Sequence, residues 1–316
     1  MKKEKATFQI QIPAKLILFG EWAVLDGYSA LGCSVGKYFT AELTPKEDAS
    51  SLTLESHEVS FDWHDIEEKV PPFLERTSSI LKSLFKNPLI LKGHVLKLYR
   101  NWKLSEGLGS SSALYLALSC LEKNFSQSEA RSKTLTEEAV QLRKKLVAYQ
   151  GSGSGFDILL QSVGTFLKAE IKNDSVFMEK VSLKIPEEIL FVHTGKKMKT
   201  DVALKEQRGY SSFSKDLGQS CEEFLLNQDW QKTIYQHNKC LEKMGVVPNF
   251  VKELKDSWIE KKWIRELKTT GAGGGDTLML FINPCKRPEL EADLTQRGFW
   301  LEEAPLGVPG ALETNL

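Results

Sequence analysis

One stretch decides the fold of this chain: Leu104-Ser105-Glu106-Gly107-Leu108-Gly109-Ser110-Ser111-Ser112-Ala113. It follows a strand-like run over residues 94–99 and opens a long helical pattern. The first N–H groups of a helix have no partner within the helix and carry a partial positive charge, so they attract anions. The two glycines let the backbone approach a ligand closely. The stretch therefore predicts a phosphate-binding loop, although a serine-capped helix start after a tight turn has the same pattern.

The composition is that of an ordinary globular protein. The chain has 316 residues, of which 41% are hydrophobic and 27% charged, and Lys+Arg equals Asp+Glu at 42. This length is sufficient for two lobes with sizeable cores. We expect a boundary at Ile185-Pro186, which gives lobes of residues 1–185 and 186–316. A net charge of zero predicts no nucleic-acid partner.

The five cysteines are scattered and lack CxxC spacing. This argues against a disulfide framework or a zinc site and fits a reducing compartment, so we expect a cytoplasmic protein. No apolar run approaches the roughly 20 residues that a membrane span needs, so no membrane partner is expected either.

Two further glycine-rich segments and one lysine stand out. The segments are Gly151-Ser152-Gly153-Ser154-Gly155-Phe156-Asp157, before an apolar run, and Thr270-Gly271-Ala272-Gly273-Gly274-Gly275-Asp276, before a strand-like run. Both are suited to close backbone approach. Lys15 stands between two apolar strand-like runs, an unusual place because lysine is rarely buried without a partner. An edge lysine that points to water is the alternative.

Lys15 with Gly20-Glu21, the loop at 107–111 and the loop at 270–275 resemble, in this order, the three motifs of the GHMP small-molecule kinases. That superfamily includes galactokinase, homoserine kinase, mevalonate kinase and phosphomevalonate kinase. The resemblance covers residues 13 to 282. It implies a two-lobed α+β fold, with an amino-terminal mixed α/β lobe of the ribosomal-protein-like type that binds ATP. The carboxy-terminal lobe would be ferredoxin-like, with the active site between the lobes.

The resemblance also implies roles for individual residues. Asp157 matches the aspartate that accepts the proton of the substrate hydroxyl, and Lys15 matches a lysine beside it. Lys15 would either stabilise the transferred negative charge or lower the pKa of the hydroxyl. The ATP phosphates would lie on Gly107, Leu108, Gly109, Ser110, Ser111 and Ser112, with Ser111 also a ligand of Mg²⁺. The implied substrate-binding residues are Glu21, Trp22, Lys197, Gly271, Ala272, Gly273, Gly274 and Asp276.

Several details resemble the mevalonate branch, and phosphomevalonate kinases in particular. Trp22 stands where mevalonate kinases usually carry His, and Asp276 where they usually have a fourth glycine. Leu146 occupies the position of their magnesium-binding Glu. The form of the segment at 150–157 is also similar to that of phosphomevalonate kinases. The basic turn at 196–199 suits a substrate that already bears a phosphate, and equally suits an exposed loop.

Mevalonate kinase remains the alternative. Ala14 replaces the usual Gly before the lysine, Ser112 replaces an alanine, and the length is typical of mevalonate kinases. Diphosphomevalonate decarboxylase and a non-catalytic regulator with the same fold are further alternatives. In either kinase the partner is a small molecule, phosphorylated or free mevalonate, and we expect a monomer or homodimer.

A dinucleotide-binding domain is the rival outside this superfamily. Gly107-x-Gly109-x-x-Ser112 is close to its fingerprint. That fingerprint requires an acidic residue at a strand end about 20 positions on. The region around residues 127–129 is polar and loop-like instead, which disfavours this alternative.

Overall fold

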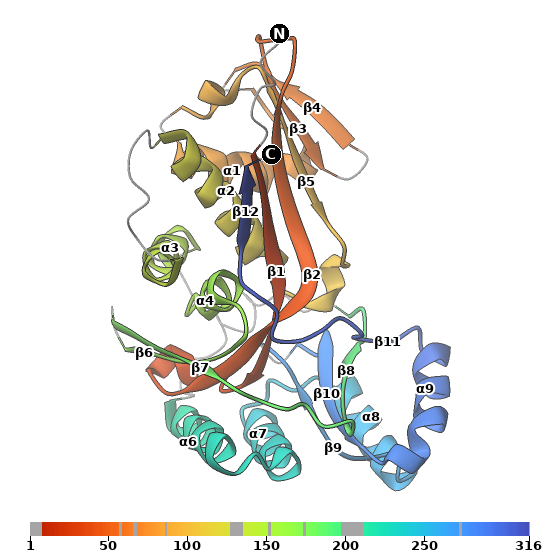
Figure 1. Ribbon diagram of the computed structural model, residues 1–316. Helices are drawn as coiled ribbons and strands as arrows, with labels where there is room; N and C mark the ends of the chain where they lie inside the picture. The colour runs from red at the N-terminus through yellow and green to blue at the C-terminus, as the bar shows by residue number, and fades with distance from the viewer. Residues whose placement is uncertain are drawn as a thin grey trace.

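The computed structural model describes residues 8–56, 59–65, 68–85, 87–126, 135–150, 153–172, 175–196, 211–271 and 274–315. Within them the strands form two separate sheets (Figure 1). The strands of the first sheet are β1 (Phe8–Phe19), β2 (Ala30–Pro45), β3 (Leu52–Ser56), β4 (Val59–Trp63), β5 (His94–Arg100), β6 (Phe166–Lys172), β7 (Ser175–Val181) and β12 (Leu312–Asn315). Their order is β12-β1-β2-β5-β3-β4, with β6 and β7 attached at β2.

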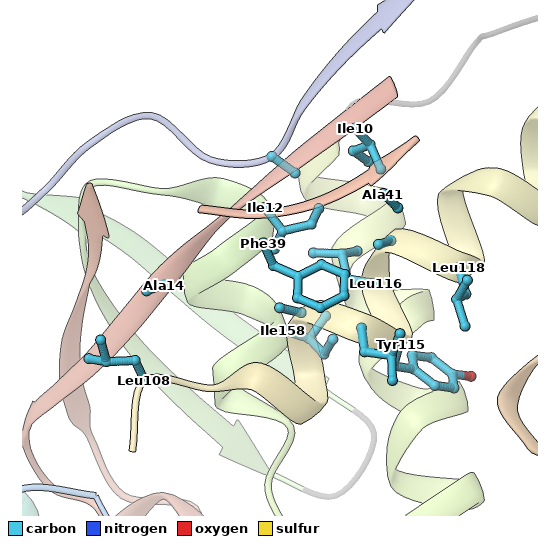
Figure 2. Close-up of a cluster of buried hydrophobic side chains, with 14 of the residues drawn as sticks. Ile10, Ile12, Ala14, Phe39, Ala41, Leu108, Tyr115, Leu116, Leu118 and Ile158 are labelled. Carbon is cyan, nitrogen blue, oxygen red and sulfur yellow. The ribbon is translucent and has the colours of Figure 1, made fainter. Parts of the chain in front are cut away.

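Helices cover one face of this sheet. They are α1 (Glu75–Leu84), α2 (Ser110–Ser126), α3 (Leu135–Gln150) and α4 (Phe156–Val163). The apolar side chains of α2 are buried against β1 and β2, and Ile158 of α4 joins the same cluster (Figure 2). The helix predicted to follow the glycine-rich stretch is therefore confirmed, and a large apolar core holds it against the sheet.

β1 is a single strand, whereas the sequence predicts two apolar strand-like runs with Lys15 between them. Its pairing with β2 shifts register between Pro13 and Ala14. Proline has no N–H to give to the ladder, so a bulge there keeps the strand continuous. The second half of β1 is buried throughout, and Lys15 in it is only 7% exposed. The reading of Lys15 as an edge lysine facing water is therefore wrong.

The second sheet contains β8 (Ile189–His193), β9 (Ile264–Thr269), β10 (Thr277–Ile282) and β11 (Trp300–Leu301). Its helices are α6 (Ser211–Asn227), α7 (Trp230–Lys243), α8 (Asn249–Glu260) and α9 (Arg287–Gln296). All pairs are antiparallel and the order is β11-β8-β10-β9. Counted along the chain this order is 4-1-3-2 with helices after the first and third strands, which is the ferredoxin-like arrangement. The fold predicted for the carboxy-terminal lobe is confirmed.

The last strand returns to the first sheet. β12 pairs antiparallel with β1, with Phe8 opposite Asn315, and so covers an edge of β1. The proposed boundary at 185/186 falls between β7 and β8, where the chain passes from the first sheet to the second; the division into lobes stays a prediction. Among the described helices, none has the length and apolarity needed to cross a membrane.

Candidate active site

The predicted phosphate-binding loop, residues 107–109 and called the phosphate loop below, connects a short 3-10 helix (Leu104–Glu106) to the start of α2. Gly107 and Gly109 have φ of 66° and 83°, a region that residues with a Cβ rarely adopt. Between them Leu108 is buried and lies beside β1 near Ala14 (Figure 2). Its carbonyl accepts a hydrogen bond of 3.1 Å from the Lys15 N–H. The loop is therefore fixed to β1 by one apolar side chain and one main-chain bond.

The three serines at the start of α2 differ in what their hydroxyls do. Ser110 Oγ accepts from Trp102 Nε1 at 2.9 Å, and Ser112 Oγ donates to the Gly109 carbonyl at 2.9 Å. Ser111 Oγ has no hydrogen bond to any described residue. Hard divalent cations bind oxygen ligands, so a hydroxyl not engaged within the protein at a helix start fits a magnesium ligand. Ser111 is the serine to which the resemblance assigns that role.

Lys15 and Asp157 lie together beside this loop. The distance from Lys15 Nζ to Asp157 Oδ1 is 3.4 Å, and the two side chains are 8% and 36% exposed. Asp157 stands in the first turn of α4, where the helix dipole favours a negative charge. A Cβ on Gly109 would lie 2.9 Å from Lys15 Cγ, so the lysine also packs against the loop. The predicted catalytic pair, Lys15 and Asp157, therefore lies next to the predicted ATP-binding loop.

Gln161 also contacts the loop beside Lys15 and Asp157, and the sequence analysis did not predict it. Its Nε2 donates to the Gly109 carbonyl at 3.2 Å, and the side chain is fully buried. It stands four residues after Asp157, on the same face of α4. The spacing of four residues from Asp157 was the sequence signal that could have indicated Gln161 as a site residue.

Asp276, which directly precedes β10 of the second sheet, packs against the loop at Gly107. A Cβ on Gly107 would overlap the Asp276 carboxylate, so only glycine leaves room for it. Burial raises the pKa of Asp276, and it outweighs the opposing effects of the Lys15 charge and of hydrogen bonds from backbone N–H groups. Among the other residues predicted from the last loop, Gly271 and Gly274 are described, whereas Ala272 and Gly273 lie outside the described residues.

Glu21 and Trp22 are placed in a buried junction between β1 and the second sheet. Glu21 Oε1 lies 2.9 Å from Lys268 Nζ, and Lys268 also donates to the Leu18 carbonyl at 2.9 Å. Burial raises the pKa of Glu21 and lowers that of Lys268, in each case against the attraction between the two. Trp22 is 4% exposed. Contact of either residue with a substrate stays a prediction, and Lys197 lies outside the described residues.

Comparison with known proteins gives relatives over nearly the whole chain, although no family model matches. The mevalonate kinase of Methanocaldococcus jannaschii is 24% identical over 307 residues, which cover 91% of this chain and 96% of that enzyme. A structure of Lactococcus lactis galactokinase complexed with galactose superimposes with a TM-score of 0.71 at 17% identity, covering 98% of this chain and 96% of the other. Streptococcus pneumoniae phosphomevalonate kinase in complex with phosphomevalonate and AMPPNP gives 0.67 at 16% identity, covering 98% and 99%.

Fold and relatives agree with each other. The chain has the two-sheet α+β fold of the GHMP small-molecule kinases. Its relative in sequence and its neighbours in structure include mevalonate kinase and phosphomevalonate kinase, which supports the resemblance to the mevalonate branch of that superfamily.

Proposed function

We propose that this protein is an ATP-dependent kinase that transfers the γ-phosphoryl group to a mevalonate-pathway substrate, with 5-phosphomevalonate as the preferred acceptor. The observation that carries the proposal is the Lys15–Asp157 pair, 3.4 Å apart and packed against the loop before α2. A carboxylate, an ammonium and a helix start at one place are what phosphoryl transfer requires, because it depends on positioning and charge neutralisation.

In the proposed reaction each residue of the site has a separate role. Backbone N–H groups at 107–112 bind the phosphates. Ser111 would hold the Mg²⁺ of the nucleotide, which would supply positive charge to the phosphoryl oxygens. The Asp157 carboxylate accepts the proton of the acceptor hydroxyl. As this proton leaves, the hydroxyl oxygen bonds to the γ-phosphorus and the bond from that phosphorus to the bridging oxygen of ADP breaks. Lys15 offsets the negative charge at the reacting oxygens.

The choice of acceptor rests on fewer residues. Asp276 and Trp22 have the residue types that resemble phosphomevalonate kinases, and Lys197 in the basic turn would bind the phosphate already present. Glu21 and the glycines at 271, 273 and 274, with Ala272, complete the proposed substrate-binding set. Mevalonate is the second candidate acceptor, because the curated relative over 91% of this chain is a mevalonate kinase.

A coupled ADP-release assay tests the proposal. The purified protein would be given Mg²⁺, ATP and, in turn, mevalonate, 5-phosphomevalonate, homoserine and galactose. We expect the highest kcat/KM with 5-phosphomevalonate. A higher value with mevalonate would transfer the assignment to the second candidate, and ADP release with none of them would contradict the proposed function. Release of CO₂ from diphosphomevalonate would reassign the protein as a decarboxylase.

A further inference from the structure

A closed network of charged side chains lies behind the phosphate loop. Lys37 Nζ, on β2, is 2.8 Å from Glu106 Oε2 and 2.9 Å from Glu302 Oε2. Glu106 directly precedes Gly107, and Glu302 directly follows β11. The two glutamate side chains are 4% and 1% exposed. Because an unpaired buried charge is strongly unfavourable, each of these groups depends on the others.

His193 and Thr277 complete the ring of contacts. His193 Nε2 lies 3.0 Å from Glu302 Oε2, and its Nδ1 lies 2.9 Å from Thr277 Oγ1. The Thr277 hydroxyl donates its single proton to the Glu106 backbone carbonyl at 2.7 Å. It can therefore only accept from His193. Glu106 is thus held at three points: at its carboxylate by Lys37 and by the Lys103 N–H, which donates to Oε1 at 3.1 Å, and at its carbonyl by the start of β10.

The same cluster has the residue types of a metal site, but Lys37 stands where the ion would. Glu106, His193 and Glu302 offer ligand atoms within 4.8 Å of one another. The ammonium of Lys37 lies within hydrogen-bond distance of both carboxylates. The chain itself supplies the cation, so the network is an internal ion-pair device.

The position of Glu106 connects the network to the loop. The residue after Glu106 is Gly107, and the residue before Thr277 is Asp276, whose carboxylate fills the space beside Gly107. The bond from Thr277 to Glu106 therefore fixes the register of the loop against β10. On its other side the loop is fixed by Leu108 and by the Lys15 N–H. A loop held on both sides has its N–H groups arranged before a ligand arrives, which removes an ordering cost from binding.

We propose that Lys37, His193 and Glu302 are positioning residues that set the affinity for the nucleotide by holding the phosphate loop in its binding conformation. This inference rests on the proposed kinase function. None of the three needs to touch substrate, because they act through Glu106 and Thr277. The network joins β2 of the first sheet to β8, β10 and the segment after β11, so it also ties the loop to both sheets.

The test compares Lys37→Met with Lys46→Met. Lys46 directly follows the same strand, its side chain is 16% exposed against 18% for Lys37, and it also bonds several groups, among them Thr53 and Asp62. Its network joins the end of β2 to β3 and β4, away from the loop. We would measure Kd for AMPPNP by calorimetry without acceptor, together with Tm, KM for ATP and kcat.

We expect Lys37→Met to raise Kd and KM for the nucleotide about tenfold or more, with kcat lowered less than about threefold. Lys37→Arg should recover most of the affinity, and Lys46→Met should lower Tm with Kd unchanged. Equal Kd values for the two methionine variants would overturn the network proposal alone. Failure of the wild-type protein to bind AMPPNP would contradict the proposed function, and this inference with it. Glu302→Gln, which keeps the shape of the side chain, provides the same comparison if Lys37→Met does not fold.

Discussion

The Asp157 carboxylate lies within ion-pair distance of the Lys15 ammonium and stands in the first turn of α4, at the place proposed for the acceptor hydroxyl. We expect Asp157→Asn to lower kcat on the order of 10²-fold or more, as for loss of a general base, with KM for ATP little changed. Steady-state kinetics with saturating acceptor would measure both constants. A near-normal kcat would remove Asp157 from the mechanism, and Asp157→Glu tests whether the position of the carboxylate matters.

The serines of the loop offer an internal comparison. Ser111→Ala should shift the dependence of activity on Mg²⁺ to higher concentration, because it removes the hydroxyl that no described residue engages. Ser112→Ala removes a hydroxyl that donates to the Gly109 carbonyl and should mainly lower stability, by about 1 kcal/mol. Titration of Mg²⁺ at fixed ATP distinguishes them. The same magnesium dependence in both variants would contradict a metal ligand at Ser111.

At the scale of the element, the phosphate loop depends on a backbone conformation that Gly107 allows. Gly107→Ala and Gly245→Ala both place a Cβ at positive φ, 66° and 71°, at about 1 kcal/mol each. Open space surrounds position 245, whereas at 107 the new Cβ would displace the Asp276 carboxylate. Only Gly107→Ala should weaken ATP binding in addition, as measured by KM and AMPPNP calorimetry. Restored affinity in the double variant Gly107→Ala/Asp276→Ala would identify the overlap as the cause; equal KM values in the two single variants would argue against it.

The junction between β1 and α7 makes stability depend on pH. His237 Nε2 accepts from the Gly20 N–H, and burial, then the charge of Lys268, lowers the pKa of His237 well below 6.5. The unfolded chain therefore takes up a proton near pH 6.5 that the folded chain does not. The stability contributed by neutral His237 is present above pH 6.5 and is lost as pH falls below it. Urea unfolding at several pH values should show a shallower decline below 6.5 for His237→Gln; an unchanged slope would contradict this.

Glu302 makes stability depend on pH in a second, more acidic range. Burial alone would raise its pKa, but hydrogen bonds from His193, the Ala304 N–H and Lys37 outweigh burial and lower the pKa to about 2 from 4.5. Its contribution to stability is therefore present above pH 4.5 and is lost as pH falls from 4.5 toward 2. Glu302→Gln should remove that part of the acid transition while leaving the part near pH 6.5 in place. The same series of urea unfolding curves measures it.

At the scale of the whole molecule, the sequence predicted those features that depend on residues close together in the chain. The loop at 104–113 and the helix that follows it were predicted from glycine punctuation and periodicity within a short window. The short strand β12 has no comparable local signal, because it gains its stability from pairing with the far end of the chain. The network of Lys37, Glu106, His193 and Glu302 draws on residues up to 265 positions apart, and no local pattern marks such a set.

The burial of Lys15 in the candidate site could likewise not be predicted from its sequence neighbours. Its sequence neighbours could not distinguish a buried lysine from an edge lysine facing water. Only the pairing of β1 with β2, the packing of Gly109 and the carboxylate of Asp157 give its ammonium a buried place and a partner. Residue types and order indicated which residues belong to the site, whereas its geometry depends on contacts between distant segments.

Transfer of label from [γ-³²P]ATP is the most direct test of the proposed reaction. The protein would be incubated with labelled ATP, Mg²⁺ and 5-phosphomevalonate, and the products separated by chromatography, with Asp157→Asn as the matched control. We expect label in a diphosphorylated acceptor with the wild-type protein and label transfer reduced on the order of 10²-fold or more with the variant. Label that remains in ATP or is found only as inorganic phosphate, with mevalonate as well as with 5-phosphomevalonate, would contradict phosphoryl transfer to a mevalonate-pathway substrate.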